Sequence, residues 1–297
     1  MVRLETIKQY NEFNNHPTLH PLATVVNLSK AAPKKRSKMY FGIYLVVLKQ
    51  VKDPGSRLRY GNQYYDFDEG TLVFIGPGQI LQSEPEGEIY QPAGMALAFH
   101  PDFIKGASLG RQIHDYSFFS YQSNEALHLS EKEKTVVLDC LANIDTELNQ
   151  NIDKHSKKLI ISNIELLLNY CTRFYDRQFI TRSEVNKGII EQFETLLNSY
   201  IFGDQLALNG LPSVAHFASE LHLSANYFGD LIKKEIGKSA LELIQLKILD
   251  AAKERTLDTS KTIAEISYSL GFKYPQHFTR FFKLKTGYTP VEYRLLG

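Results

Sequence analysis

The C-terminal region repeats one pattern, with FGDLIKKEIGKS at residues 228–239 and FTRFFKLKTGYT at residues 278–289. Both stretches read F-x-x-apolar-apolar-K-x-x-x-G-x-[S/T], and they lie 50 residues apart. Upstream, VAHF at residues 214–217 matches IAEI at residues 263–266, here 49 residues apart. The second copy therefore has one extra residue in its turn. Repetition at a nearly fixed spacing indicates two copies of one supersecondary unit.

Each copy has the features of a helix-turn-helix unit, in which a short turn joins two helices. Gly271 suits the left-handed residue that ends the first helix of the second copy, and His222 takes the same place in the first copy. We predict helix-turn-helix units over residues 213–236 and 262–285. A long helix over residues 239–256 is expected to join them and to fix their relative positions.

The sequence also marks the ends of the second helix in each copy. Ser224 and Pro275 are residue types that favour the first positions of a helix. Gly237 and Gly287 follow the last apolar positions, where glycine commonly takes the left-handed conformation that ends a helix. We therefore expect each second helix to run from its serine or proline to its glycine.

The second copy contains the longer pattern IAEI-x4-GF-x5-F-x-R-x-FK-x3-G-x-TP-x2-YR over residues 263–294. This pattern resembles the AraC/XylS family of bacterial transcription regulators, and the resemblance extends over about 100 residues of the chain. It implies that the second helix of each copy enters a major groove of DNA. Such elements lie about one helical turn, or ~10 base pairs, apart.

The exposed side of each second helix carries side chains suited to DNA. Gln276 can pair with adenine and Arg280 with guanine, each through two hydrogen bonds. Lys233 and Lys283 suit phosphates, whereas Asp230 would repel phosphates unless it accepts a hydrogen bond from a cytosine amine. An ordinary solvated helix face is the alternative. The candidate DNA-binding residues are Asn226, Tyr227, Lys233, Gln276, His277, Thr279, Arg280 and Lys283.

Composition places the chain among ordinary globular proteins. It has 297 residues, of which 43% are hydrophobic and 23% charged, with a net charge of +1. This balance excludes a uniformly basic coat for nucleic acid. Residues 211–297 nevertheless hold 12 Lys and Arg against 9 Asp and Glu. This excess of positive charge is compatible with a local basic face in the C-terminal region. The polar N-terminus lacks the apolar core of a signal peptide, and we expect a cytoplasmic protein.

Residues 1 to about 125 contain short strand-like runs separated by turn signals, which predict a β-sandwich or barrel. Residues 69–78 resemble the strand and Pro-Gly turn of the cupin-like arm of the same family, which often binds an effector. His-x-His is absent from the sequence, so we predict no metal and no cofactor, with His16 and His20 as surface histidines rather than ligands. The candidate effector-pocket residues are Tyr44, Arg59, Tyr64 and Phe74.

A helical hairpin is predicted over residues from about 130 to 178. Ser130 and Glu133 form a capping-box pattern that opens its first helix. The second helix is apolar on more than one side, which favours dimerisation over burial within a single protomer. The predicted dimerisation residues are Ile160, Ile164, Leu167, Leu168 and Cys171. Cys140 and Cys171 are too few for a disulfide scaffold or a four-cysteine zinc site, so we expect reduced, buried thiols.

The sequence therefore predicts an α+β multidomain protein. Residues 1–180 form a cupin-like β-barrel domain with a helical hairpin, for sensing and dimerisation. Residues 185–297 form an AraC-type, all-α DNA-binding domain. The predicted function is sequence-specific transcription regulation gated by a small-molecule effector. The expected partners are promoter DNA, an effector and a second copy of the chain, with RNA polymerase as a further candidate and no membrane.

Two alternatives share the DNA-binding C-terminus. In the first, the protein is a constitutive regulator whose N-terminal domain only dimerises. In the second, less favoured one, a cupin enzyme is fused to a DNA-binding tail. The GASLG motif at residues 106–110 has the spacing of a hydrolase nucleophile, but a nucleophile elbow needs a strand before it and a helix after it in an α/β setting. We therefore predict that the protein is not an enzyme.

Overall fold

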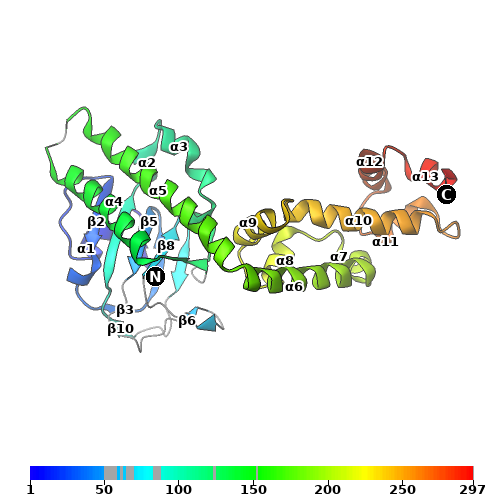
Figure 1. The fold of residues 1–297 in the computed structure, drawn as a ribbon, viewed down its shortest axis with the longest axis horizontal. Helices are drawn as coiled ribbons and strands as arrows, with labels where there is room; N and C mark the ends of the chain where they lie inside the picture. Colours follow the sequence, from blue (N-terminus) through cyan, green and yellow to red (C-terminus); the bar gives the residue numbers. More distant parts are fainter. Residues whose placement is uncertain are drawn as a thin grey trace. The chain divides into compact units, whose positions relative to one another are not determined.

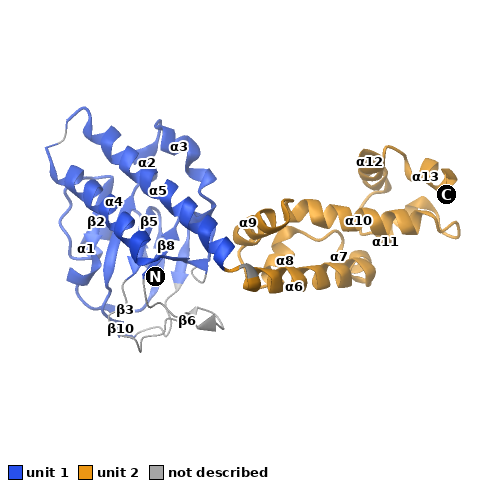
Figure 2. Cartoon of the chain, viewed as in Figure 1, with its two compact units in different colours: residues 1–181 blue, residues 182–297 orange. Residues whose placement is uncertain are grey.

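The computed structural model describes the chain apart from residues 50–58, 61–62, 65–69, 83–87, 123–124, 152 and 297. Contacts within the chain divide it into two compact units, residues 1–181 and 182–297 (Figure 2). Unit 1 contains strands and helices, and unit 2 is helical in its described part (Figure 1). No helix among the described residues is long and apolar enough to cross a membrane.

A five-stranded antiparallel sheet forms the centre of unit 1. Its register pairs Val47 with both Val73 and Ala96, so these residues share one face. Four of its strands have buried residues on both faces, which explains why their apolar runs are nearly continuous. The strands are, in order across the sheet, β12 (Leu127–His128), β8 (Thr71–Ile75), β5 (Tyr44–Lys49), β11 (Gly94–Phe99) and β2 (Ala23–Asn27).

Smaller sheets complete the β-structure of unit 1. In a three-stranded sheet, β4 (Lys38–Phe41) pairs in parallel with β1 (Val2–Leu4) and antiparallel with β9 (Ile80–Gln82). The described pairings leave the five-stranded sheet open at β12 and β2, so the closed cupin-like barrel stays a prediction. Two further pairs are β3 (Lys34–Lys35) with β10 (Ile89–Tyr90), and β6 (Arg59–Tyr60) with β7 (Gln63–Tyr64).

The central sheet is covered on both faces. One face packs against the three-stranded sheet and α1 (Ile7–Phe13), and this core includes Leu4, Ile7 and Phe41. The other face meets aromatic side chains. The ring centroid of Phe74 on β8 lies 4.3 Å from that of Phe118 and 6.0 Å from that of Tyr175. The sheet is therefore the middle layer of unit 1.

The helical hairpin forms as predicted. Helix α4 (Glu131–Asn149) begins with a complete capping box, because the Ser130 hydroxyl accepts from the Glu133 amide and the Glu133 carboxylate accepts from the Ser130 amide. Helix α5 (Ser156–Thr181) runs alongside α4 (Figure 1) and extends about three residues past the predicted end of the hairpin at residue 178. Cys140 and Cys171 are free and buried, as expected.

The apolar face of α5 does not form a free surface. Helix α5 packs against α4 and β12, and its Tyr175 ring also contacts Phe74 and Phe118. The exposed apolar residues of α5 are Leu159 and Leu166, which are 46% and 45% exposed, together with Ile180. The five residues predicted to mediate dimerisation are instead buried within one protomer: Ile160, Ile164, Leu167, Leu168 and Cys171.

Several short helices lie between β11 and β12. The GASLG serine, Ser108, opens the short helix α3 (Ser108–Gln112), and its hydroxyl donates to Glu165 Oε2 at 3.0 Å. The element before it is α2 (Pro101–Ile104), a helix rather than the strand that a nucleophile elbow requires. The remaining short helical turns of unit 1 are η1 (Leu28–Lys30), η2 (Ile113–Asp115) and η3 (Ser117–Ser120).

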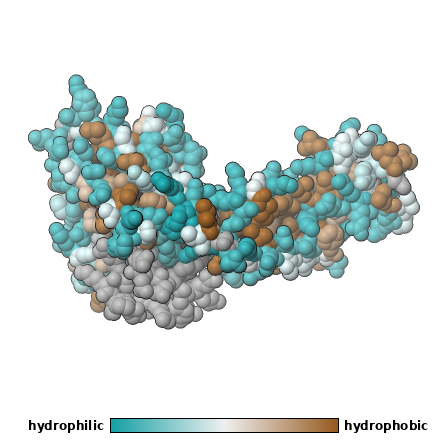
Figure 3. All heavy atoms as spheres, viewed as in Figure 1, coloured by the Kyte–Doolittle hydropathy of each residue, from teal (hydrophilic) through white to brown (hydrophobic). Residues whose placement is uncertain are grey.

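Unit 2 contains eight described helices. Some apolar side chains remain at its surface (brown in Figure 3). Leu295 and Leu296 near the C-terminus are among the exposed ones. The helices are α6 (Ser183–Phe202), α7 (Gln205–Asn209), α8 (Val214–Glu220), α9 (Ala225–Ile236), α10 (Ala240–Thr256), α11 (Ile263–Ser269), α12 (Pro275–Thr286) and α13 (Pro290–Leu296).

Candidate nucleic-acid interface

The first helix-turn-helix copy consists of α8 and α9. The Ser213 hydroxyl accepts from the His216 amide at the start of α8, and the Ser224 hydroxyl accepts from the Tyr227 amide at the start of α9. His222 in the turn has a φ of 57°, the left-handed conformation predicted for it. Gly237 ends α9 in the same conformation, with a φ of 77°.

The second copy consists of α11 and α12. Thr262 and Glu265 form a capping box at the start of α11, and Pro275 begins α12. Gly271 and Gly287 end the two helices with φ values of 78° and 85°. The predicted helix ends are thus confirmed in both copies.

The turn of the second copy also packs tightly against α7. A Cβ atom on Gly271 would lie 2.6 Å from the Leu206 carbonyl oxygen and 2.8 Å from the carbonyl carbon of Gly210. Glycine is therefore required here both for its left-handed backbone and for lack of space. The repeat alone does not show this second reason, because α7 lies outside it.

Buried aromatic rings hold one side of each second helix. Phe228 on α9 has its ring centroid 5.0 Å from that of Phe193 on α6, and Phe217 on α8 lies 5.3 Å from the same ring. Phe278 and Phe282 on α12 pack against each other at 5.6 Å and are fully buried. Because these rings fill the cores, the opposite sides of α9 and α12 face solvent.

Two arginines connect the second copy to the rest of unit 2. Arg255 on α10 donates from Nη1 to the carbonyl of Ser269 at 2.8 Å and from Nη2 to the carbonyl of Ile201 at 3.1 Å. Arg294 on α13 donates from Nε to the carbonyl of Thr256 at 2.7 Å. Each guanidinium thus satisfies carbonyl groups at helix C-termini that lack a partner within their own helix.

Most of the candidate DNA-binding residues are exposed. On α12, Gln276, His277, Arg280 and Lys283 are exposed and Thr279 is half-buried. On α9, Asn226 and Lys233 are exposed. Tyr227 does not lie with them, because its side chain packs into unit 2 and is only 5% exposed. The alignment of the repeat could not reveal this difference, since it pairs Tyr227 with the exposed His277.

The two second helices differ in charge. Helix α12 carries Arg280, Lys283 and Lys285 and no acidic residue, whereas the two lysines of α9 are balanced by Asp230 and Glu235. Lys285 is exposed and was not among the predicted residues. Its position on a helix that already carries two cations is the signal that could have identified it.

Two of the predicted effector-pocket residues, Tyr44 and Phe74, have described side chains, and their surroundings differ. Tyr44 lines a hollow of about 410 Å³, between the β8–β9 loop and residues 113–120. Burial raises the pKa of its hydroxyl. Phe74 is buried in the aromatic cluster and does not line this hollow. The side chains of Arg59 and Tyr64 lie outside the described residues. The lining residues that sequence reasoning missed are Gly76, Pro77, Gly78, Gln79, Ile113, His114, Tyr116, Phe119 and Ser120.

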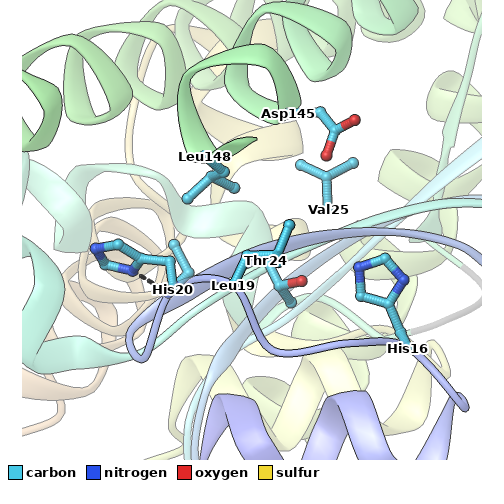
Figure 4. Close-up of a pocket in the computed structure, with 8 residues that line it drawn as sticks. His16, Leu19, His20, Thr24, Val25, Asp145 and Leu148 are labelled. Atoms are coloured by element: carbon cyan, nitrogen blue, oxygen red, sulfur yellow. Dashed lines mark hydrogen bonds between the residues drawn. The ribbon is translucent and has the colours of Figure 1, made fainter. Parts of the chain in front are cut away.

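His16 and His20 border a second, much smaller hollow, near Asp145 (Figure 4). His20 Nδ1 accepts hydrogen bonds from the amides of Leu22 and Ala23, so this nitrogen already has protein partners. Burial lowers the pKa of both histidines. Among the described residues, no three His, Cys, Asp or Glu side chains gather in a way that could hold a metal ion.

Comparison with known proteins identifies the C-terminal repeat. A family model described as a helix-turn-helix domain matches residues 217–295. The bifunctional transcriptional activator/DNA repair enzyme AdaA of Bacillus subtilis is 32% identical over 105 residues, covering 34% of this chain. The chain spans about half of AdaA, 47% of its length.

Two further similarities accompany this match. The uncharacterized HTH-type transcriptional regulator YijO of Escherichia coli is 24% identical over 235 residues, covering 76% of this chain and 78% of YijO. A solved structure of a transcriptional regulator from Chromobacterium violaceum, described as AraC-type, is 21% identical and covers 37% of this chain and 91% of its own, with a TM-score of 0.32. The family match confirms the helix-turn-helix domain that the repeat predicts in unit 2.

Proposed function

We propose that the protein is a transcription regulator that binds promoter DNA through α9 and α12. One observation carries the proposal: a segment that matches a helix-turn-helix family holds two copies of the motif, each with the solvent side of its second helix exposed. In such motifs the second helix enters the major groove, and paired motifs read sites about one helical turn apart. Binding at a promoter would recruit or block RNA polymerase.

The exposed side chains divide by chemistry into two groups. Gln276, Arg280 and Asn226 have the donors and acceptors that discriminate base edges, with His277 and Thr279 beside them on α12. Lys233 lies seven residues after Asn226 and Lys283 seven residues after Gln276, about two turns further along each helix. Both lysines suit phosphate contacts, which position the protein without reading sequence.

The test is selection of bound fragments from a pool of genomic DNA by the purified full chain. We expect enrichment of a motif that Arg280→Ala relaxes at one base position. Lys283→Ala is the matched control, because loss of a phosphate contact weakens binding to all sequences and lowers the salt slope by about one. Both residues are exposed, so both variants should melt like the wild type. The proposal fails if the wild-type chain enriches no fragment at low salt.

We also propose that unit 1 senses a small molecule in the hollow lined by Tyr44. Its volume of about 410 Å³ lies within the range of small-molecule sites. Tyr44 lines the hollow, and its ring stacks on that of Phe99 with 5.0 Å between centroids. A ligand would raise the melting temperature of the wild-type chain. A panel of small metabolites should therefore give a shift that Tyr44→Ala abolishes.

A constitutive, dimerising regulator is the competing function, and exposed Leu159 and Leu166 on α5 favour a dimer contact there. These residues lie seven positions apart and thus on one side of the helix. Sedimentation of the wild type and of the double variant Leu159→Gln, Leu166→Gln tests the contact. A dimer that the variant converts to monomer supports it, and an unchanged dimer excludes this surface.

A further inference from the structure

The two helix-turn-helix copies are not equivalent in the side chains they offer to DNA. The 50-residue offset pairs Asn226 with Gln276, Gly229 with Thr279 and Asp230 with Arg280. Both helices are held by buried phenylalanines at the paired positions Phe228 and Phe278. Their paired surface positions can therefore be compared directly.

Helix α12 presents a continuous set of side chains that can read bases. Gln276 and Arg280 are exposed and lie four residues apart, which places them on one side of the helix. Exposed His277 and half-buried Thr279 flank them. An amide and a guanidinium are the side chains that make two-bond contacts with adenine and guanine, respectively.

Helix α9 offers much less at the same positions. Asn226 is exposed, but Tyr227 is 5% exposed and Gly229 has no side chain. At the place of Arg280 stands Asp230, a half-buried carboxylate whose charge opposes phosphate binding. Only Asn226 among these four positions combines exposure with the chemistry of base discrimination.

The charges of α9 and α12 show the same asymmetry as their base-reading side chains. Helix α12 carries three cations and no acid, while α9 carries two lysines, one aspartate and one glutamate. Lys233 remains exposed at the position that corresponds to Lys283. Helix α9 therefore presents a cation suited to phosphate but fewer side chains that can read bases.

From this asymmetry, and given the DNA-binding function proposed above, we infer that α12 supplies nearly all of the base specificity, whereas α9 serves mainly as a phosphate clamp. The preferred DNA then contains one well-specified half-site, with a guanine for Arg280 and an adenine for Gln276. The neighbouring half-site, one helical turn away, specifies at most one adenine, through Asn226.

The test is binding selection from a random-sequence DNA pool with the full chain and two variants at paired positions, Arg280→Ala and Asp230→Asn. We expect a single specified block of bases in the wild-type motif. Arg280→Ala should lose its guanine and weaken binding to the selected site about 5- to 150-fold. Asp230→Asn should leave the motif unchanged and strengthen binding to all sequences by up to about five-fold.

The outcomes of this selection separate the further inference from the DNA-binding proposal on which it rests. Two equally specified blocks about ten base pairs apart, or loss of a cytosine preference in Asp230→Asn, would show that α9 reads bases and would overturn this inference alone. No enrichment by the wild-type chain at low salt would overturn the DNA-binding proposal and this inference with it. Thermal melting of each variant checks that the surface change has left the fold intact.

Discussion

Replacement of Gly271 by alanine should destabilise the second helix-turn-helix copy by roughly 2–5 kcal/mol. The left-handed backbone, with a φ of 78°, costs a residue with a Cβ about 1–2 kcal/mol. The added Cβ would also lie 2.6 Å from the Leu206 carbonyl oxygen and within 3 Å of Gly210. Both contacts are with backbone atoms, so α7 must move away from the turn. Overpacking of this kind typically costs a further ~1–3 kcal/mol.

Gly237 provides the matched control. It has nearly the same φ, 77°, but no atom lies within 4 Å of the Cβ that alanine would add. Gly237→Ala should therefore show only the backbone cost of about 1–2 kcal/mol.

Hydrogen exchange of the full chain measures each effect where it occurs, in peptides from α7 and α11 for Gly271→Ala and in peptides from α9 for Gly237→Ala. Gly271→Ala should accelerate exchange in α7 and α11 far more than Gly237→Ala accelerates it in α9. Equal protection in the two variants would refute the argument that the approach of α7 makes glycine necessary.

Three further predictions concern the cores and the buried charges. Phe193→Ala should cost about 3–5 kcal/mol in denaturant unfolding of unit 2, because Phe193 is 1% exposed and contacts both helices of the first copy. Arg255→Lys should destabilise unit 2 by about 1–3 kcal/mol, because one ammonium cannot donate to the carbonyls of Ser269 and Ile201 at the same time, as the guanidinium does. An unchanged free energy of unfolding would contradict this. Burial lowers the pKa of Lys34 from 10.5 to about 8. The Lys34 amine therefore binds its proton more tightly in the unfolded chain than in the folded one. As a result, the free energy of unfolding of the wild type should rise with pH above about 8, relative to that of Lys34→Met. Urea titrations at several pH values measure this difference.

The sequence predicted helix ends well because these depend on local chemistry. Ser130 with Glu133, and the glycines at 237 and 287, act on backbone groups within a few residues of themselves. The repeat then placed the two copies, since each position in one had a partner in the other. This local information was enough to find the helix-turn-helix units and the exposed residues of α12.

Predictions that depended on the identity of a packing partner were less accurate. The apolar pattern of α5 showed that Ile160 and Leu167 are buried, but it did not show that α4 and the sheet cover them rather than a second protomer. Tyr227 and His277 occupy the same place in the repeat, yet only the tyrosine is buried. Phe74 likewise joined an aromatic cluster instead of lining a hollow. In each case the outcome depends on residues distant in the sequence.

Helix α6 shows how far the folded helix-turn-helix unit extends beyond the repeat that reveals it. The family match begins at residue 217, whereas α6 begins at Ser183. Phe193 on α6 completes the core of the first copy, and Asn186 donates to Glu235 on α9 at 2.7 Å. At its other end, α6 supplies the Ile201 carbonyl to Arg255 and leads into α7, which packs against the turn of the second copy. Helices α6 and α10 together thus fix both copies in one body, and removal of α6 would expose the core of the first copy and remove a support of the second.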